Sequence, residues 1–283
     1  MCSSDLPSLA DAHIHARLIT LTPAIKLLRA EPTASTAYRA LMENRMHNVN
    51  LYVETPAMRD HIAATYNLSS DVYPYLLAPA QFTTKSRGAQ TVFGYFGGMR
   101  NEKGFARLLP IITQLAATHI PSDPPLAFII HASDARGSRA DDLARAFAAL
   151  ATPTLKIDFI AGPLSAADYQ ARFDEIDVAL LPYTGARYAL SGSGIVCEAL
   201  AMGKAVITSK GLSFGGQLDE THSIQAPDDT SFAASILYLA RNIPRYRAAA
   251  TARAQTYHSD IATNPLLTRL VGASRHPGVS AVG

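Results

Sequence analysis

From residue 91 onward, short apolar runs alternate with longer segments in which apolar residues recur every three or four positions. The short runs are typical of buried strands, and the longer periodic segments are typical of amphipathic helices. Strands are predicted at 91–97, 126–131, 155–161, 177–182 and 205–209. Helices are predicted between them, at 102–118, 138–150, 165–175 and 194–202. Strands and helices that alternate in this way predict an α/β fold with a doubly wound parallel sheet.

Further elements continue the pattern toward the end of the chain. They are a short strand at 223–226 and helices at about 229–241 and 243–257. Pro110 lies inside the predicted helix 102–118. A kink or break is expected there, because proline lacks a backbone donor and clashes with the preceding turn. Residues 261–283 are small and polar near their end and are predicted to form a tail.

Residues 1–80 show a weaker alternation, which predicts an incomplete α/β region. Pro56 opens a predicted helix that closes near Asn67. Other helices are expected at 22–30 and 35–47, and extended segments at 48–55 and 71–79. Residues 81–90 are polar, lack periodicity and are typical of a linker. The sequence therefore predicts a partial domain over 1–80, a linker, and a main domain over 91–260.

One strand–helix–strand unit of the main domain carries a loop of very small residues. The strand that ends in DVALLPY (177–183) leads to the loop SGSG (191–194), which opens a helix. Because these residues have almost no side chain, the first N–H groups of the helix can approach an anion closely. Glu198 lies one turn further along that helix. The carboxyl edge of the sheet is therefore the predicted ligand site.

Two segments resemble those of a known enzyme family. DVALLPY and the segment SGSGIVCEALAMGKAVITS (191–209) resemble the signature of family-four glycosyltransferases. FGYFGGMRNEKGF (93–105) resembles the first strand of the family's donor lobe, which ends in a lysine–glycine pair. The resemblance covers residues 91–260, and residues 34–80 less fully. It implies a fold of the GT-B type, with a Rossmann-like C-terminal donor lobe and part of an N-terminal acceptor lobe.

The resemblance also implies roles for individual residues. Glu198 would hold the ribose of the nucleotide, while Lys103 and Arg100 would neutralise the diphosphate. Ser193 and Gly194 would donate N–H bonds to it. All the candidate donor-binding residues are Gly98, Arg100, Lys103, His131, Leu164, Ser191, Gly192, Ser193, Gly194, Ile195 and Glu198. The catalytic groups on the acceptor side are expected from the other lobe and are unknown.

Several of these candidates have an ordinary structural alternative. Lys103 can be a solvated lysine at a helix start, and Arg100 a surface arginine in a loop. Glu198 can be a carboxylate stabilised by the helix dipole alone. His131 ends a strand, where local hydrogen bonds can satisfy its ring. The sequence leaves these alternatives open.

The chain departs from the family pattern at two positions. Leu190 replaces an acidic residue eight positions before Glu198, so Ser191 or Ser193 is expected to substitute near the donor sugar. Gly98 stands where the family often has arginine, and Arg100 is the expected replacement, because a guanidinium can bond two phosphate oxygens at once. The loop 162–164 matches the family region that lines the nucleotide base.

The implied reaction is sugar transfer from a nucleotide diphosphate sugar to a glycan, lipid or other hydroxyl acceptor. It would retain the anomeric configuration and need no metal or other cofactor. The resemblance leaves open whether this chain alone turns over the donor. One alternative is a non-catalytic nucleotide-sugar-binding module. Another is a metal-dependent hydrolase like the amidohydrolases, which would use the pair His13 and His15 in DAHIH.

Composition and charge limit the possible ligands and the cellular location of the protein. The 283 residues carry a net charge of +2, which makes no electrostatic case for nucleic acid. No apolar run approaches the roughly 18–20 residues that a membrane span needs, although peripheral contact at a membrane is compatible with the sequence. Cys2 and Cys197 are too few for a disulfide framework, which favours a cytoplasmic location. The opening MCSSDL resembles a translated sequencing-adapter remnant, so the natural chain is expected to extend upstream.

Overall fold

The computed structural model describes residues 52–67, 69–72, 90–184, 188–189 and 191–264. The chain divides into two compact units, Leu77–His258 and Met1–Leu76 together with Ser259–Gly283. The predicted helices at 22–30 and 35–47 and the pair His13 and His15 lie outside the described residues. In the described part of the chain, no helix is both long and apolar enough to cross a membrane.

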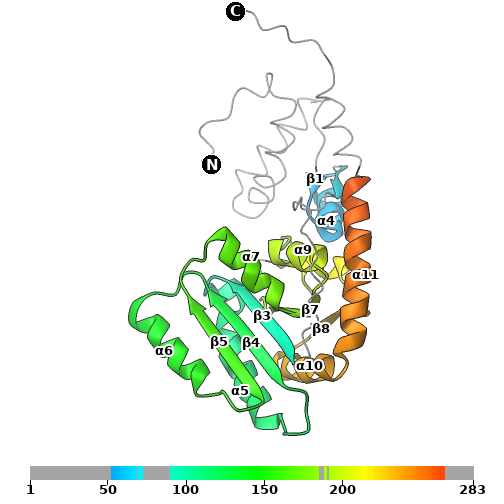
Figure 1. Cartoon of the computed structure of the whole chain (residues 1–283). Coiled ribbons are helices and arrows are strands. Elements are labelled where there is room, and N and C mark those ends of the chain that lie inside the picture. The colour runs from blue at the N-terminus through cyan, green and yellow to red at the C-terminus, as the bar shows by residue number, and fades with distance from the viewer. Residues whose placement is uncertain (1–51, 68, 73–89, 185–187, 190, 265–283) are drawn as a thin grey trace, which may run out of the picture. The chain divides into compact units, whose positions relative to one another are not determined.

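The larger unit is built on a six-stranded sheet in which all neighbouring strands are parallel (Figure 1). The strands are β3 (Thr91–Gly97), β4 (Leu126–Ala132), β5 (Leu155–Ala161), β6 (Val178–Leu181), β7 (Ala205–Ser209) and β8 (Ser223–Ala226). Their order is β5-β4-β3-β6-β7-β8. The direction of winding therefore reverses between β3 and β6, which is where open α/β sheets bind ligands. The predicted α/β fold with a doubly wound sheet is confirmed.

The strands at this reversal pair over a short length. β3 aligns with β4 along seven residue pairs but with β6 at only two, Phe93↔Val178 and Gly94↔Ala179. Gly94 allows the close approach, because a Cβ atom there would lie 2.5 Å from the side chain of Ile176, just before β6. Beyond Gly94 the two strands no longer pair, and their carboxyl ends lead into the two loops of the candidate site.

Helices cover both faces of the sheet (Figure 1). They are α5 (Phe105–Thr118), α6 (Gly137–Ala148), α7 (Ala166–Glu175), α9 (Gly194–Ala201), α10 (Asp229–Arg241) and α11 (Ile243–Ala262), with short 3₁₀ turns η1 (Asn101–Lys103) and η2 (Ser213–Gln217). The main core joins one face of the sheet to α5, α6, α10 and the start of α11. On the other face, Phe96 of β3 packs against Phe173 of α7, with ring centroids 5.0 Å apart. Burial on both faces explains why β4, β6 and β7 read as continuous apolar runs, whereas β5 at the edge of the sheet carries Lys156 and Asp158.

The predicted helix 102–118 is wrong at its start. Gly104 has φ +66, and this left-handed conformation separates η1 from α5. Further along, α5 continues through Pro110, so the predicted break does not occur. Pro110 lies on the exposed side of the helix, where water can satisfy the carbonyl group that loses its N–H partner.

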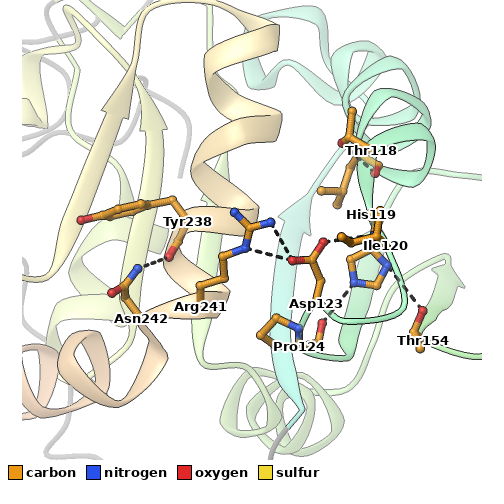
Figure 2. A network of polar contacts seen from close by, with 10 residues as sticks. Thr118, His119, Ile120, Asp123, Pro124, Thr154, Tyr238, Arg241 and Asn242 are labelled. Carbon is orange, nitrogen blue, oxygen red and sulfur yellow. Dashed lines mark hydrogen bonds and ion pairs between the residues drawn. The ribbon is translucent and has the colours of Figure 1, made fainter.

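Charged side chains fasten α10 and α11 to the sheet. Arg247 of α11 donates to both carboxylate oxygens of Asp177, at 3.0 and 2.9 Å, and Asp177 accepts the N–H of Val92 in β3. At the end of α10, Arg241 donates twice to Asp123 before β4 (Figure 2). The Asp177 and Asp123 carboxylates are almost fully buried, so they need these charged partners.

The described part of the smaller unit contains a short parallel pair of strands and one helix. β1 (Tyr52–Val53) pairs with β2 (Asp71–Val72). Helix α4 (Pro56–Tyr66) begins with proline, as predicted, and ends at Asn67, which has φ 53. Thr55 caps the helix by accepting the N–H of Met58. Half of the predicted strand 48–55, most of segment 71–79, and the linker 81–90 except its last residue lie outside the described residues. The predicted domain boundaries stay predictions.

Candidate functional site

Two loops meet where the winding of the sheet reverses. The loop Asn101–Gly104 follows β3, and the loop Pro182–Thr184 follows β6. The N–H of Thr184 donates to the carbonyl oxygen of Glu102 at 3.0 Å. A Cβ atom on Gly104 would lie 1.7 Å from the carbonyl oxygen of Pro182. Glycine is therefore needed at 104 both for its positive φ and for this close contact.

Arg107 holds the same region together from α5. Its guanidinium donates to the carbonyl oxygen of Pro182 at 2.6 Å and to Ser209 Oγ at 2.8 Å. It also pairs with Asp229 at the start of α10, with Nε 2.7 Å from Oδ1. Arg107 thus joins the carboxyl ends of β6 and β7 to two helices. Neither its spacing nor its neighbours in the sequence marked it, because its partners are 75 to 122 residues away.

The ammonium group of Lys103 lies near the end of β3 and the loop after β6. A Cβ atom on Gly97, the last residue of β3, would be 3.3 Å from Lys103 Nζ. The Nζ atom also lies 5.7 Å from the ring centroid of Tyr183, a distance that permits a cation–π interaction. The charge of Lys103 acts on Glu198, whose pKa it helps to lower against a larger opposing effect of burial. The structure therefore places Lys103 within electrostatic range of Glu198.

Glu198 is partly buried in the second turn of α9. Burial raises the pKa of its carboxyl group above the usual value, and a hydrogen bond from Tyr169 and the charge of Lys103 act in the opposite direction. The Tyr169 hydroxyl donates to Glu198 Oε2 at 2.5 Å. Burial and the neighbouring Glu198 raise the pKa of Tyr169, so Tyr169 keeps its proton and is the donor. Sequence reasoning missed Tyr169, which lies on α7.

The start of α9 presents an anion-binding arrangement. Ser193 caps the helix, with Oγ 3.4 Å from the N–H of Val196, and its side chain is also hydrogen-bonded to Tyr183. The N–H groups of Gly194 and Ile195 have no partner among the described residues. Ser213 Oγ fastens the preceding loop by donating to the carbonyl oxygen of Ser191 at 2.5 Å. The predicted loop 191–194 is therefore anchored while the first helix N–H groups stay available.

The segment after β3 is less available than predicted. The N–H of Met99 donates to Asp134 Oδ1 at 2.6 Å, and the carbonyl oxygen of Gly98 accepts the Tyr95 hydroxyl at 2.8 Å. Arg100 is largely exposed and lies 3.3 Å from the carboxylate of Glu102. The surface alternative for Arg100 therefore fits this structure, and a phosphate contact would require it to leave Glu102.

His131 is buried at the end of β4. Its Nε2 lies 2.9 Å from the carbonyl oxygen of Gly162, and because a carbonyl can only accept, Nε2 carries the hydrogen. The other ring nitrogen, Nδ1, has no partner among the described residues. The ring packs near Tyr169, with centroids 6.3 Å apart. Leu164 is half-buried in the loop that follows Gly162. His131 is thus partly satisfied locally, beside the residue that contacts Glu198.

Metal ligation is not indicated in the part of the chain that the structure describes. There, no group of three or more His, Cys, Asp or Glu side chains is placed to hold a metal ion. Cys197 is buried within α9 and forms no disulfide.

Comparison with known proteins supports the fold. No protein-family model and no curated protein sequence matches the chain. Its structure is similar to sucrose-phosphate synthase from Thermosynechococcus elongatus, with a TM-score of 0.58 and 16% identity over 89% of this chain and 66% of that one. It is also similar to Anabaena HepE, solved with UDP and glucose, with a TM-score of 0.56 and 15% identity over 79% of this chain and 63% of that one. A third similar structure is the pneumococcal O-GlcNAc transferase GtfA, solved with UDP and GlcNAc, with a TM-score of 0.55 and 14% identity over 81% of this chain and 46% of that one.

These neighbours are glycosyltransferases of the GT-B type. At such low identity, the likeness shows the fold, and it confirms a Rossmann-like lobe of that type. The chain spans between 46% and 66% of the length of these three neighbours.

Proposed function

We propose that residues 91–260 form the donor-binding domain of a glycosyltransferase that uses a nucleotide diphosphate sugar. One observation carries the proposal. Lys103, the carboxylate of Glu198, and the N–H groups of Gly194 and Ile195, which have no partner among the described residues, lie where the winding of a doubly wound sheet reverses. Two of the similar structures contain UDP together with a sugar, which suits a site of this chemistry.

Each group suits one part of such a donor. The ammonium group of Lys103 and the helix N–H groups would bind the diphosphate, because both favour negative charge. The carboxylate of Glu198 would accept hydrogen bonds from ribose hydroxyl groups, which are donors. Leu164 and the backbone around Gly162 would line the base. Gly98, Ser191 and Gly192 would contribute backbone groups nearby, and Arg100 would contribute once it is released from Glu102.

The proposed reaction breaks the bond between the anomeric carbon and the diphosphate oxygen. A bond forms between that carbon and the acceptor hydroxyl oxygen, whose proton passes to a phosphate oxygen of the departing nucleotide diphosphate. Negative charge develops on the departing diphosphate, so fixed positive groups around it lower the barrier. Lys103 and the α9 N–H groups would supply this stabilisation without a resident metal. We further propose the family-four subtype, a hexosyl donor, retention of configuration, and acceptor-side groups outside residues 91–260.

A thermal-shift panel of UDP, GDP, ADP and their sugars tests this proposal. A ligand at about a hundred times its dissociation constant should add about 2.7 kcal/mol to the free energy of unfolding. We expect one nucleotide to stabilise the wild type, and Lys103→Ala and Glu198→Gln to lose that effect. Lys156→Ala and Glu175→Gln, which change exposed residues away from the site, serve as matched controls. A folded wild type that no nucleotide stabilises at millimolar concentration would overturn the proposal.

A non-catalytic nucleotide-sugar-binding module is the second candidate, favoured by Leu190 in place of the family's acidic residue. It predicts the same ligand stabilisation without turnover. Release of free nucleotide diphosphate from the donor, measured with a mixed panel of hydroxyl acceptors, would decide for the transferase. The metal-hydrolase alternative depends on His13 and His15, and stoichiometric zinc in the purified protein would support it.

A further inference from the structure

The contact between Tyr169 and Glu198 links two helices on the same face of the sheet. Tyr169 lies in the first turns of α7, and Glu198 lies in α9, 29 residues later. Their hydrogen bond joins a hydroxyl donor to a carboxylate oxygen at 2.5 Å, within the range of charge-assisted hydrogen bonds. No other described residue donates a hydrogen bond to the carboxylate of Glu198.

The ring of Tyr169 is held by its neighbours. Its centroid lies 5.4 Å from that of Phe96 and 5.8 Å from that of Phe173, and the centroid of the His131 ring is 6.3 Å away. Ser165 caps α7 by accepting the N–H of Asp168, which fixes the first turn of this helix. A hydroxyl on a packed ring has little freedom to follow a mobile partner. The carboxylate of Glu198 is therefore oriented by Tyr169, and not the reverse.

We propose that Tyr169 is a positioning residue, which holds Oε2 of Glu198 so that Oε1 is presented to a ribose hydroxyl of the nucleotide. This inference rests on the proposed function. It adds to the site a residue that none of the sequence motifs indicated. Without Tyr169, a glutamate side chain has three rotatable bonds, and ligand binding would have to order them. Tyr169 supplies that order in advance.

The same contact controls the protonation of Glu198. The charged or titratable groups that act on Glu198 are Lys103 from the loop after β3, Tyr183 from the loop after β6, and Tyr169 from α7. Burial raises the pKa of Glu198, while the Tyr169 hydrogen bond lowers it. Removing the hydroxyl should therefore raise the pKa of Glu198 further, with Lys103 and Tyr183 still in place. The ionised carboxylate is the better acceptor for ligand hydroxyl groups. As the pH is lowered, nucleotide affinity should therefore begin to fall at a higher pH in Tyr169→Phe than in wild type.

The first experiment needs no ligand. The protein is labelled with ¹³C at the glutamate carboxyl carbons, and the Glu198 signal is assigned by its loss in Glu198→Gln. We expect the titration midpoint of that signal to move to higher pH in Tyr169→Phe. Tyr246→Phe, which changes a buried tyrosine on α11, is the matched control and should leave the midpoint unchanged. A midpoint that stays in place or moves to lower pH in Tyr169→Phe would overturn the inference.

The second experiment is a double-mutant cycle on UDP affinity, measured by calorimetry near neutral pH. Tyr169→Phe should weaken binding by about tenfold in the wild-type background. In the Glu198→Ala background, where the weaker binding is measured at higher UDP concentration, the same change should have an effect of less than about twofold, because the side chain that Tyr169 orients is absent. Equal losses in both backgrounds would mean that Tyr169 acts without Glu198, and would overturn the inference.

The two experiments separate this inference from the proposed function. If the folded wild type binds neither UDP nor another nucleotide, the proposed function is wrong. The carboxyl titration would then still decide whether Tyr169 controls Glu198. If nucleotide binds and the titration midpoint does not move, the proposed function stands and the positioning role of Tyr169 is wrong.

Discussion

Substituting Gly104 by alanine tests whether the two loops of the site are as closely packed as the structure has them. Gly104 has φ +66, a conformation that costs an L-residue about 1–2 kcal/mol. The added methyl group would also lie 1.7 Å from the carbonyl oxygen of Pro182, so the loops must separate. This separation would lengthen or break the hydrogen bonds from Thr184 to Glu102 and from Arg107 to Pro182.

The expected loss follows from these contributions. Two hydrogen bonds at about 0.5–1.5 kcal/mol each, added to the backbone cost, lower the free energy of unfolding by about 2–5 kcal/mol. A domain is commonly stable by only about 5–15 kcal/mol, so this change is readily measured by urea denaturation followed by circular dichroism. Lys103 precedes Gly104 directly, so nucleotide affinity should fall as well.

Gly137→Ala is the matched control. Gly137 has φ +54, but among the described residues nothing lies within 4 Å of a Cβ atom placed there. It should therefore show the backbone cost of about 1–2 kcal/mol alone. If Gly104→Ala loses no more stability than Gly137→Ala, the close contact with Pro182 does not exist and the reasoning is refuted.

Other predictions address the supports of the site. Asp177→Asn should lower the free energy of unfolding by about 1–3 kcal/mol in urea melts, because it weakens a mostly buried pair with Arg247, which is itself about a third exposed; a loss no larger than that of the exposed Asp142→Asn would contradict this. Burial lowers the pKa of His222 below its usual 6.5, partly opposed by Asp219, so the unfolded chain takes up this proton first and stability falls as pH drops below 6.5. His222→Gln should flatten that fall, and an unchanged slope would rule out His222 as its cause. Dialysis against EDTA should leave the UDP dissociation constant within about twofold of its value in magnesium, and a large loss would show that a metal takes part.

Local patterns predicted several strands to the residue. β3, β5, β7 and β8 fall at their predicted residues. For the fully buried β7, an apolar run of strand length has few alternatives in a parallel sheet. The start of α5 was mispredicted, since periodicity continues across Gly104 while its backbone conformation does not. Helix α5 is continuous through Pro110 because that residue faces water. Which side of α5 faces water depends on how the helix packs on the sheet.

In the candidate site too, some residues could be recognised from local sequence spacing and others only from tertiary contacts. Lys103, Ser193 and Glu198 could be proposed from the sequence because each stands at a fixed offset from a strand end or helix start. Tyr169 carried no such signal. Its importance arises from contact with Glu198 across two helices, and contacts over such separations are not written in local spacing.

The sequence by itself determined the class of fold, the edge of the sheet where a ligand would bind, and the residues that lead into it. It could do so because strand burial, helix capping and glycine conformations are local consequences of residue type. Only the tertiary structure decided that Arg107 joins two strand ends, that Arg100 pairs with Glu102, and that Tyr169 orients Glu198. These contacts depend on which helices share a face and how closely they pack, and the packing of the whole unit sets both.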